Sequence, residues 1–138
     1  MTGIMRGSLT PSVHSRATGA LRSELHYTFY GAIMIFDLRI YTFKPGMQNA
    51  WLAMYEQHAY PVQLRYLGKP VVFTTAEIGP LNQVVHLWAY ADQAERERKR
   101  EAMQQDPQWQ AYLKMNTEAG YMAHMENRIL RSTSFSPL

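Results

Sequence analysis

The sequence contains no cysteine, and no apolar run approaches the roughly 20 residues that a membrane-spanning helix requires. Without cysteine there is no disulfide framework and no thiolate metal site. The histidines do not replace it, because no HxH or HxxxH pair occurs and His58, His86 and His124 lie far apart in the chain. We therefore expect one domain with no metal, no cofactor and no membrane partner.

The short motifs of several common enzyme classes are also missing. Gly46, Gly68 and Gly79 are isolated turn glycines, and neither GxxxxGK nor GxGxxG surrounds them. No GxSxG occurs. Nucleotide binding and serine hydrolysis therefore have no support in the sequence.

The net charge is small and unevenly distributed. The whole chain carries +3, and the first 33 residues account for two of these charges. A nucleic-acid-binding domain is expected to carry its excess positive charge on the folded part, where several phosphates are neutralised. We therefore expect no nucleic-acid partner.

Residues 1–33 differ in composition from the rest, with Arg6, Arg16 and Arg22 against Glu24 alone and many Ser, Thr and Gly. Three interpretations remain open: a transit-like leader, a tag, or an upstream start ahead of Met34. A secretory signal is disfavoured because no apolar h-region follows the early arginine. We expect residues 34–138 to form the domain and the protein to be cytoplasmic, or mitochondrial if the segment is a transit peptide.

The pattern from Met34 onward predicts the order strand, helix, strand, strand, helix, strand. Proline at position 61 is expected to end or kink the first helix. Asp92 with Glu95, and Asp106 with Pro107, are N-cap signals. The remaining predicted elements are strands at 34–43, 71–78, 83–90 and 125–131 and a helix starting near Met47. This order predicts an α+β, ferredoxin-like domain with an antiparallel four-stranded sheet.

Strict alternation divides the two longest strands into two faces. Leu38, Ile40, Val85 and Leu87 make one face aliphatic, and we expect it to pack under the helices. The other face combines polar and aromatic residues, and we expect a second copy of the sheet to cover it in a symmetric dimer. Its members are Asp37, Arg39, Tyr41, Phe43, Val84, His86, Trp88 and Tyr90.

Four stretches of the chain resemble the NIPSNAP family. They are DLRIYTFKPG, TAEIGPLNQVVHLWAYADQAERERKR, DPQWQAYL and ILRSTSFSPL, and the resemblance extends over Met34 to Leu138. It implies a dimeric α/β-barrel in which two ferredoxin-like sheets face each other. It implies no reaction, because the family has no settled enzymatic activity.

The polar–aromatic face supplies the candidate site. Arg39 is suited to hold a carboxylate or enolate, His86 to move a proton near neutral pH, and Tyr41 to donate to a developing oxyanion. These three are the candidate catalytic residues. The candidate ligand-binding residues are Trp88, Tyr90, Asp37 and Glu77, and Asp37, Glu77 and Glu126 are possible counterions of Arg39.

Two functions follow from this reading. One is a metal-free, small-molecule-binding barrel, possibly an enzyme for proton transfer or oxygenation of an anionic or carbonyl-containing substrate. The other is a non-catalytic dimeric interaction module. A void beside Arg39 and His86 would favour the first. As structural alternatives, His86 is a hydrogen-bonded strand residue, His58 and His124 lie at the surface, and the core holds Trp51, Tyr55, Trp109 and Tyr112.

Overall fold

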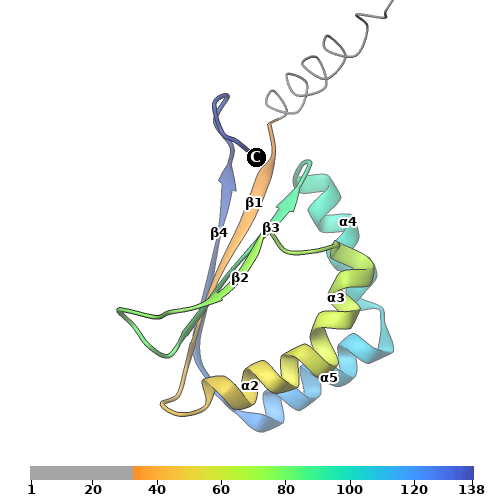
Figure 1. Cartoon of the computed structure of the whole chain (residues 1–138). Coiled ribbons are helices and arrows are strands. Elements are labelled where there is room, and N and C mark those ends of the chain that lie inside the picture. The colour runs from red at the N-terminus through yellow and green to blue at the C-terminus, as the bar shows by residue number, and fades with distance from the viewer. Residues whose placement is uncertain (1–32) are drawn as a thin grey trace, which may run out of the picture.

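The computed structural model describes residues 33–138 (Figure 1). The expectations for residues 1–33, including the leader and the localisation drawn from it, concern positions that, apart from Ile33, lie outside the described residues. The elements, in chain order, are β1 (Ile35–Phe43), α2 (Gln48–Met54), η1 (Tyr55–Ala59), α3 (Tyr60–Leu67), β2 (Val72–Thr75), β3 (Gln83–Tyr90), α4 (Gln93–Gln104), α5 (Pro107–Ala119) and β4 (Met122–Arg131).

The four strands form one antiparallel sheet in the order β2-β3-β1-β4. The ferredoxin-like prediction is therefore confirmed. The last strand was placed three residues too late, because β4 begins at Met122 and not at Met125. Gly120 adopts a left-handed φ of 63° that ends α5, so the chain enters the strand almost at once.

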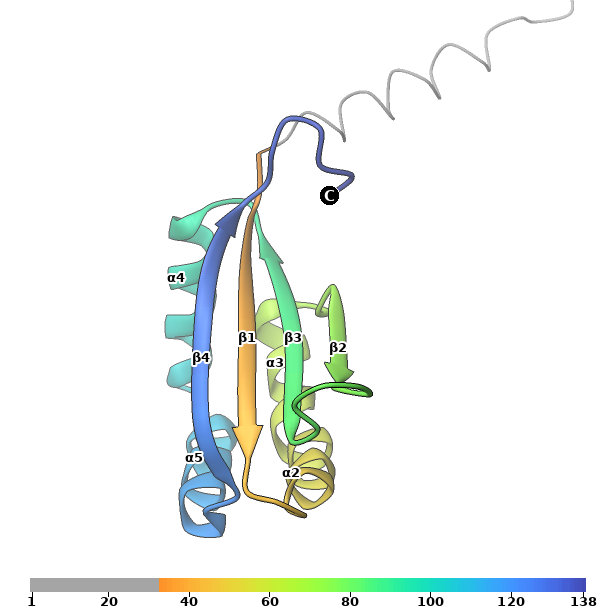
Figure 2. The ribbon, with the colours of Figure 1, turned by 90° about the vertical axis from the view of Figure 1, so that its left-hand side faces the viewer.

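All the helices within residues 33–138 lie on one side of the sheet (Figure 1), and the view in Figure 2 looks onto the side that these helices leave uncovered. None of the helices in residues 33–138 is both long and apolar enough to cross a membrane. Because the helices cover only one face, the sheet and the helix layer enclose a single interior, and this interior contains the core and the candidate site.

The first helical segment continues through Pro61, so this proline does not end the helix, and the alternative expectation, a kink, coincides with a change of helix type at this place. Pro61 is the second residue of α3, and the wider π-helical turn η1 comes immediately before it. Near a helix start the missing N–H of proline costs little. The wide turn also places Tyr55 and Ala59 in the interior.

Both predicted N-caps are confirmed. The Asp92 side chain accepts a hydrogen bond from the Glu95 amide at 2.7 Å, and the Glu95 carboxylate accepts one from the Ala91 amide. The Asp106 side chain accepts a hydrogen bond from the Gln108 amide at 2.7 Å. These caps fix where α4 and α5 begin and so position the residues they point at the sheet.

The sequence assigned the two sheet faces the wrong way round. The register pairs Asp37 with Trp88 and Arg39 with His86, so these side chains share one face as expected. That face lies under the helices: Val84, His86, Trp88 and Tyr90 are all buried, whereas Val85 and Leu87 are only partly buried. Large aromatic rings fill the wide gap between a sheet and a helix layer, and alternation alone does not say which face the helices cover.

The interior core is mainly aromatic. As predicted, Trp51, Tyr55, Trp109 and Tyr112 are buried in it, together with Phe43, Trp88 and Tyr90. Trp51 packs against Phe43 and Tyr55 with ring centroids 4.7 and 4.6 Å apart. As expected, His124 is largely exposed, whereas His58 is partly exposed on the helix surface.

Candidate functional site

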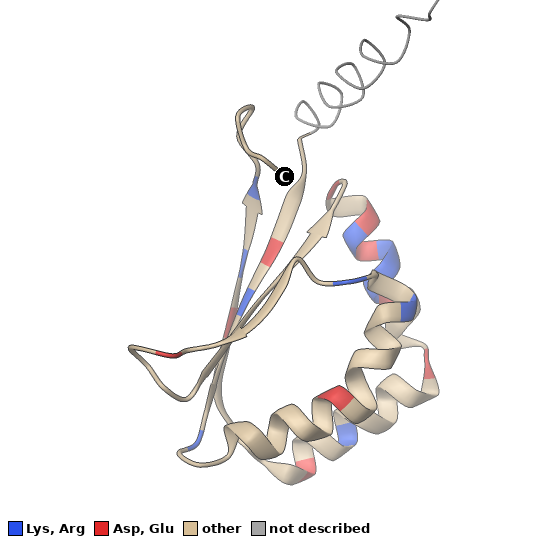
Figure 3. Ribbon diagram, in the orientation of Figure 1, with Lys and Arg blue, Asp and Glu red and all other residues tan. Residues whose placement is uncertain are grey.

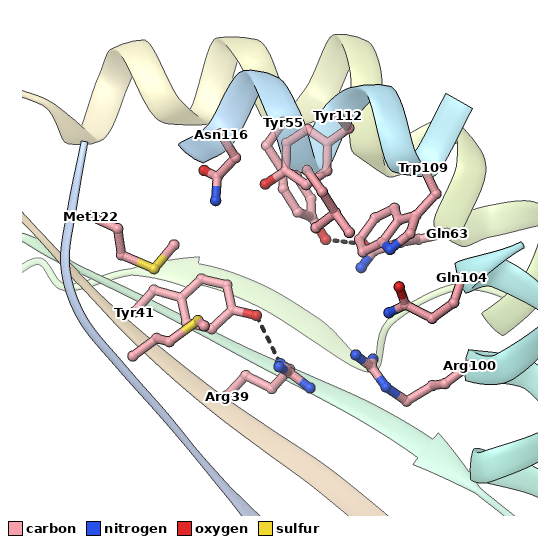
Figure 4. A pocket seen from close by; sticks show the side chains of 12 residues that line it. Arg39, Tyr41, Tyr55, Gln63, Arg100, Gln104, Trp109, Tyr112, Asn116 and Met122 are labelled. Carbon is pink, nitrogen blue, oxygen red and sulfur yellow. Dashed lines mark hydrogen bonds between the residues drawn. The ribbon is translucent and has the colours of Figure 1, made fainter. Parts of the chain in front are cut away.

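A cavity of about 180 Å³ lies between β1 and the helices. Residues from five elements and from the edge strand β4 line it, and Figure 4 shows them converging on one space. The lining residues are Arg39, Tyr41, Tyr55, Gln63, Arg100, Gln104, Trp109, Tyr112, Leu113, Asn116, Met122 and Met125. Two of the three predicted catalytic residues, Arg39 and Tyr41, therefore face this cavity.

Asp37 is the buried anion beside the cavity. Its carboxylate lies 3.1 Å from Arg39 Nη1 and 2.9 Å from Arg96 Nη2, and it accepts a hydrogen bond from Asn127 at 3.0 Å. Burial alone raises the pKa of Asp37, but the Asn127 hydrogen bond and the two guanidinium groups outweigh it and hold the pKa below its usual value. Asp37 is therefore the counterion of Arg39 and stays ionised.

Arg39 orients Tyr41. The Arg39 Nε–H donates to the Tyr41 hydroxyl oxygen at 2.8 Å, while Nη1 donates to Asp37. A guanidinium only donates, so the Tyr41 oxygen is the acceptor in this bond. The phenolic hydrogen of Tyr41 is then free to point into the cavity toward a ligand.

Arg100 adds a second cation to the cavity wall. It comes from α4, where charged residues are dense (Figure 3), and its guanidinium approaches that of Arg39 (Figure 4). Within residues 33–138, no carboxylate lies within ion-pair distance of Arg100. Burial and then the charge of Arg39 lower the pKa of Arg100, which is the sign of a cation held in an unfavourable position.

The cavity offers hydrogen-bond donors. In two of the side chains, Asn116 and Gln63, the amide oxygen already accepts a hydrogen bond within the protein, so the amide NH₂ group remains to donate. Asn116 Oδ1 accepts from the Trp51 indole N–H at 3.0 Å, which leaves its NH₂ group to donate. Gln63 Oε1 likewise accepts from the Tyr55 hydroxyl. The Trp109 indole N–H is buried in the cavity wall with no hydrogen-bond partner among the described residues. With the two arginines, these donors make a site suited to an acceptor-rich anion.

The surroundings of His86 do not support the proton-transfer role that the sequence suggested. It is fully buried, does not line the cavity, and accepts a hydrogen bond at Nδ1 from the Trp88 indole N–H at 2.7 Å. Burial, and then the nearby charge of Arg39, lower its pKa to about 3. The imidazole therefore stays neutral at physiological pH, stacked against Phe73 with ring centroids 4.5 Å apart. The geometry matches the structural alternative for this residue.

The predicted ligand-binding residues are brought together only in part. Asp37 contacts Arg39, but Trp88 and Tyr90 pack in the core without lining the cavity, and Glu77 is exposed in the loop between β2 and β3. The void lies beside Arg39 and not beside His86. The ligand-binding role of these residues stays a prediction, and Glu77 does not line the cavity beside Arg39.

Sequence reasoning missed most of the donors. Arg100 lies in a run of alternating charges that is typical of a solvated helix face, and Trp109 was assigned to the core alone. The sequence offers one minor alternative for this run: Arg96 and Arg100 are one turn apart, so both could reach from one face of α4 to an acidic ligand or to a partner subunit. Arg96 indeed reaches Asp37, donating from Nε at 3.0 Å.

A second hollow, of about 310 Å³, lies on the other side of Tyr55. It is lined by Leu52, Tyr55, Glu56, Tyr60 and Phe73, and Glu56 is its one ionisable group apart from the tyrosines. Among residues 33–138, no cluster of three or more His, Asp or Glu side chains is placed to hold a metal ion. The first cavity is therefore the candidate site, because it combines charge with unpaired donors.

Comparison with known proteins places the chain among one group. The NIPSNAP family model matches residues 36–137. An uncharacterized NIPSNAP-like domain protein from Burkholderia xenovorans is 37% identical, with a TM-score of 0.70, covering 76% of this chain and 90% of that one. A NIPSNAP family protein of unknown function from Agrobacterium tumefaciens is 32% identical, with a TM-score of 0.69, covering 76% of this chain and 93% of that one.

More distant matches are consistent with this. The human protein NipSnap homolog 3A is 30% identical over 112 residues, which is 78% of this chain and 44% of that protein. The chain thus spans less than half the length of this curated relative. A putative antibiotic biosynthesis monooxygenase from Nitrosomonas europaea has a TM-score of 0.53 at 12% identity, covering 72% of this chain and 89% of that one, which shows a shared fold alone.

Proposed function

The chain belongs to the NIPSNAP family, and from that premise we propose that it is a metal-free, small-molecule-binding protein that takes a small anion into the cavity between β1 and the helices. The ligand is a carboxylate or an enolate. Arg39 and Arg100 supply the charge, and Tyr41, Trp109 and Asn116 supply hydrogen bonds.

The observation that carries this proposal is the uncompensated charge of the site. Arg39 and Arg96 share one carboxylate, that of Asp37, and Arg100 has no acidic partner within residues 33–138. A partly buried cation without an acidic partner is costly to the fold. A bound anion removes that penalty, so the arrangement favours a ligand over a purely structural role.

The same geometry limits the chemistry. Proton transfer by His86 is not supported, because its imidazole is neutral and lies outside the cavity. Tyr41, whose oxygen already accepts from Arg39, is positioned to donate its hydrogen to a ligand carbonyl or enolate oxygen. If the protein is an enzyme, we propose that Arg39, Tyr41 and Arg100 stabilise negative charge that develops on the substrate.

Arg100→Met tests the binding role. We expect affinity for butanoate or benzoate to fall about tenfold to a hundredfold, since a hydrogen bond to a charged group contributes roughly 1.5–3 kcal/mol. We expect the stability of the free protein to stay the same or rise, because the variant removes a desolvated charge from beside Arg39. Isothermal titration calorimetry and urea unfolding measure the two effects.

Arg98→Met is the matched control, because Arg98 lies on the same helix but is exposed and outside the cavity. It should bind the carboxylates as the wild type does. Equal losses in Arg98→Met and Arg100→Met, or no binding of any small carboxylate by the wild type, would refute the proposed site.

The interaction-module alternative is favoured by a separate observation, the uncovered face of the sheet. Leu38, Ile40, Val85 and Leu87 lie on this face and are only partly buried, and Val72 is 45% exposed on the same face. No helix within residues 33–138 covers this face of the sheet (Figure 2). We propose that a second copy packs its own sheet here in a homodimer, so the aliphatic face replaces the aromatic one as the expected interface.

Leu87→Lys tests the homodimer. Because the substitution places a charge at the centre of an apolar interface, we expect a dimer in the wild type and a monomer in the variant by analytical ultracentrifugation. Circular dichroism should show that the variant remains folded. Glu77→Lys, in the exposed loop, should stay dimeric, and a monomeric wild type would contradict the proposal.

A further inference from the structure

The lining residues of the cavity divide by exposure. Tyr55, Gln63, Trp109 and Tyr112 are buried, Arg39, Tyr41 and Arg100 are partly exposed, and the exposed members are Gln104, Leu113 and Met125. The exposed residues mark where the cavity meets solvent, between α5 and the edge strand β4. Met125, on β4, is 58% exposed, and Leu113, on α5, is 38% exposed.

Two of the three exposed side chains at the mouth, Leu113 and Met125, are apolar and the third is Gln104, whereas the interior is rich in hydrogen-bond donors. Met122, at the start of β4, also lines the cavity (Figure 4) and is less exposed than Met125. Methionine side chains are flexible and polarisable, and they adapt to apolar groups of different shape. A ligand that consisted only of a small polar anion would leave the apolar side chains of Leu113, Met122 and Met125 without a partner.

The volume of the cavity also indicates a ligand that extends beyond it. Its volume of about 180 Å³ is below the range of roughly 300–1,000 Å³ that is usual for ligand sites. It holds a headgroup and a short stem. The rest of a larger ligand has to leave through the mouth, past Leu113 and Met125.

We propose that the ligand is an amphipathic carboxylic acid. This inference rests on the proposed function and adds the chemical class of the ligand. The carboxylate lies against Arg39 and Arg100, and an unbranched or aryl apolar portion extends outward along Met122, Met125 and Leu113. The apolar portion contributes affinity by covering these side chains, and the headgroup supplies orientation.

The test is a chain-length series of butanoate, hexanoate and octanoate, each below its micelle concentration, measured by calorimetry on the full chain. We expect affinity to rise about twofold to fourfold for each added methylene, since burying one contributes up to about a factor of four. Octylamine, which has the same tail and the opposite charge, should not bind. The Met125→Ser/Leu113→Ser double variant should lose most of the chain-length gain.

Ile129→Ser is the matched control. Ile129 is on β4, 45% exposed and on the same face as Met125, but it does not line the cavity. It should keep the chain-length gain. If butanoate binds through Arg100 and longer acids bind no better, the inference is overturned while the proposed function stands; if no acid binds, both fail. Equal binding of octylamine would also overturn it.

Discussion

Asp37→Ala is expected to destabilise the protein by about 3–5 kcal/mol, which is the usual consequence of removing one partner of a buried ion pair. The carboxylate is fully buried, and the side chains of Arg39 and Arg96 are only 16% and 15% exposed. Without Asp37 both guanidinium groups remain desolvated and unpaired, and Asn127 loses its acceptor. Urea unfolding followed by circular dichroism measures the change in free energy.

Glu126→Ala is the control for this prediction. Glu126 lies on β4, its side chain is 44% exposed, and it lies 4.0 Å from Arg128. We expect a change below about 1 kcal/mol, because exposed ion pairs contribute little. A similar effect of the two substitutions would show that the cluster around Asp37 does not stabilise the fold.

Acid is expected to destabilise the protein through His86 well before the carboxylates protonate. The unfolded imidazole has an ordinary pKa near 6.5, whereas the folded one has a pKa of about 3. Below pH 6.5 the unfolded state therefore binds a proton that the folded state does not, and stability falls until the pH reaches the folded pKa. At 1.36 kcal/mol per pH unit, about 2–3 kcal/mol is lost between pH 7 and pH 4.5.

His86→Gln isolates this effect, because the amide oxygen can still accept the Trp88 indole hydrogen bond. The variant should lose about 2–3 kcal/mol less than the wild type between pH 7 and pH 4.5. His124→Gln, at a largely exposed position, should follow the wild type. Asp37 acts only at lower pH, because its pKa is depressed and its contribution is lost below about pH 4. An NMR titration in which His86 protonates between pH 6 and pH 7 would contradict the prediction.

Much of the fold was predictable because its signals are local. Alternation in the two long strands, the caps at Asp92 and Asp106, and the turn between β2 and β3 each depend on residues close together in the chain. These signals were sufficient for the element order and hence for the ferredoxin-like sheet. These signals were least accurate at element boundaries, as at Met122 and Pro61, because contacts with neighbouring elements determine where a strand or a helix begins and ends.

The candidate site was predictable only in part, for a different reason. Alternation placed Arg39 and Tyr41 on one face, and the need of a buried cation for a counterion suggested Asp37. Arg100, Trp109 and Asn116 come from other elements, and no local pattern connects them with β1. His86 shares the face of Arg39 but is separated from the cavity by its packing.

The sequence by itself determined the order of the strands and helices and which side chains share a face, because these follow from the periodicity of the backbone. The tertiary structure decided which face the helices cover, and with it the location of the cavity. The aromatic face of Trp88 and Tyr90 lies inside because only large rings fill the gap beneath the helices, while Leu38 and Leu87 remain on the uncovered face. That choice depends on packing between distant segments.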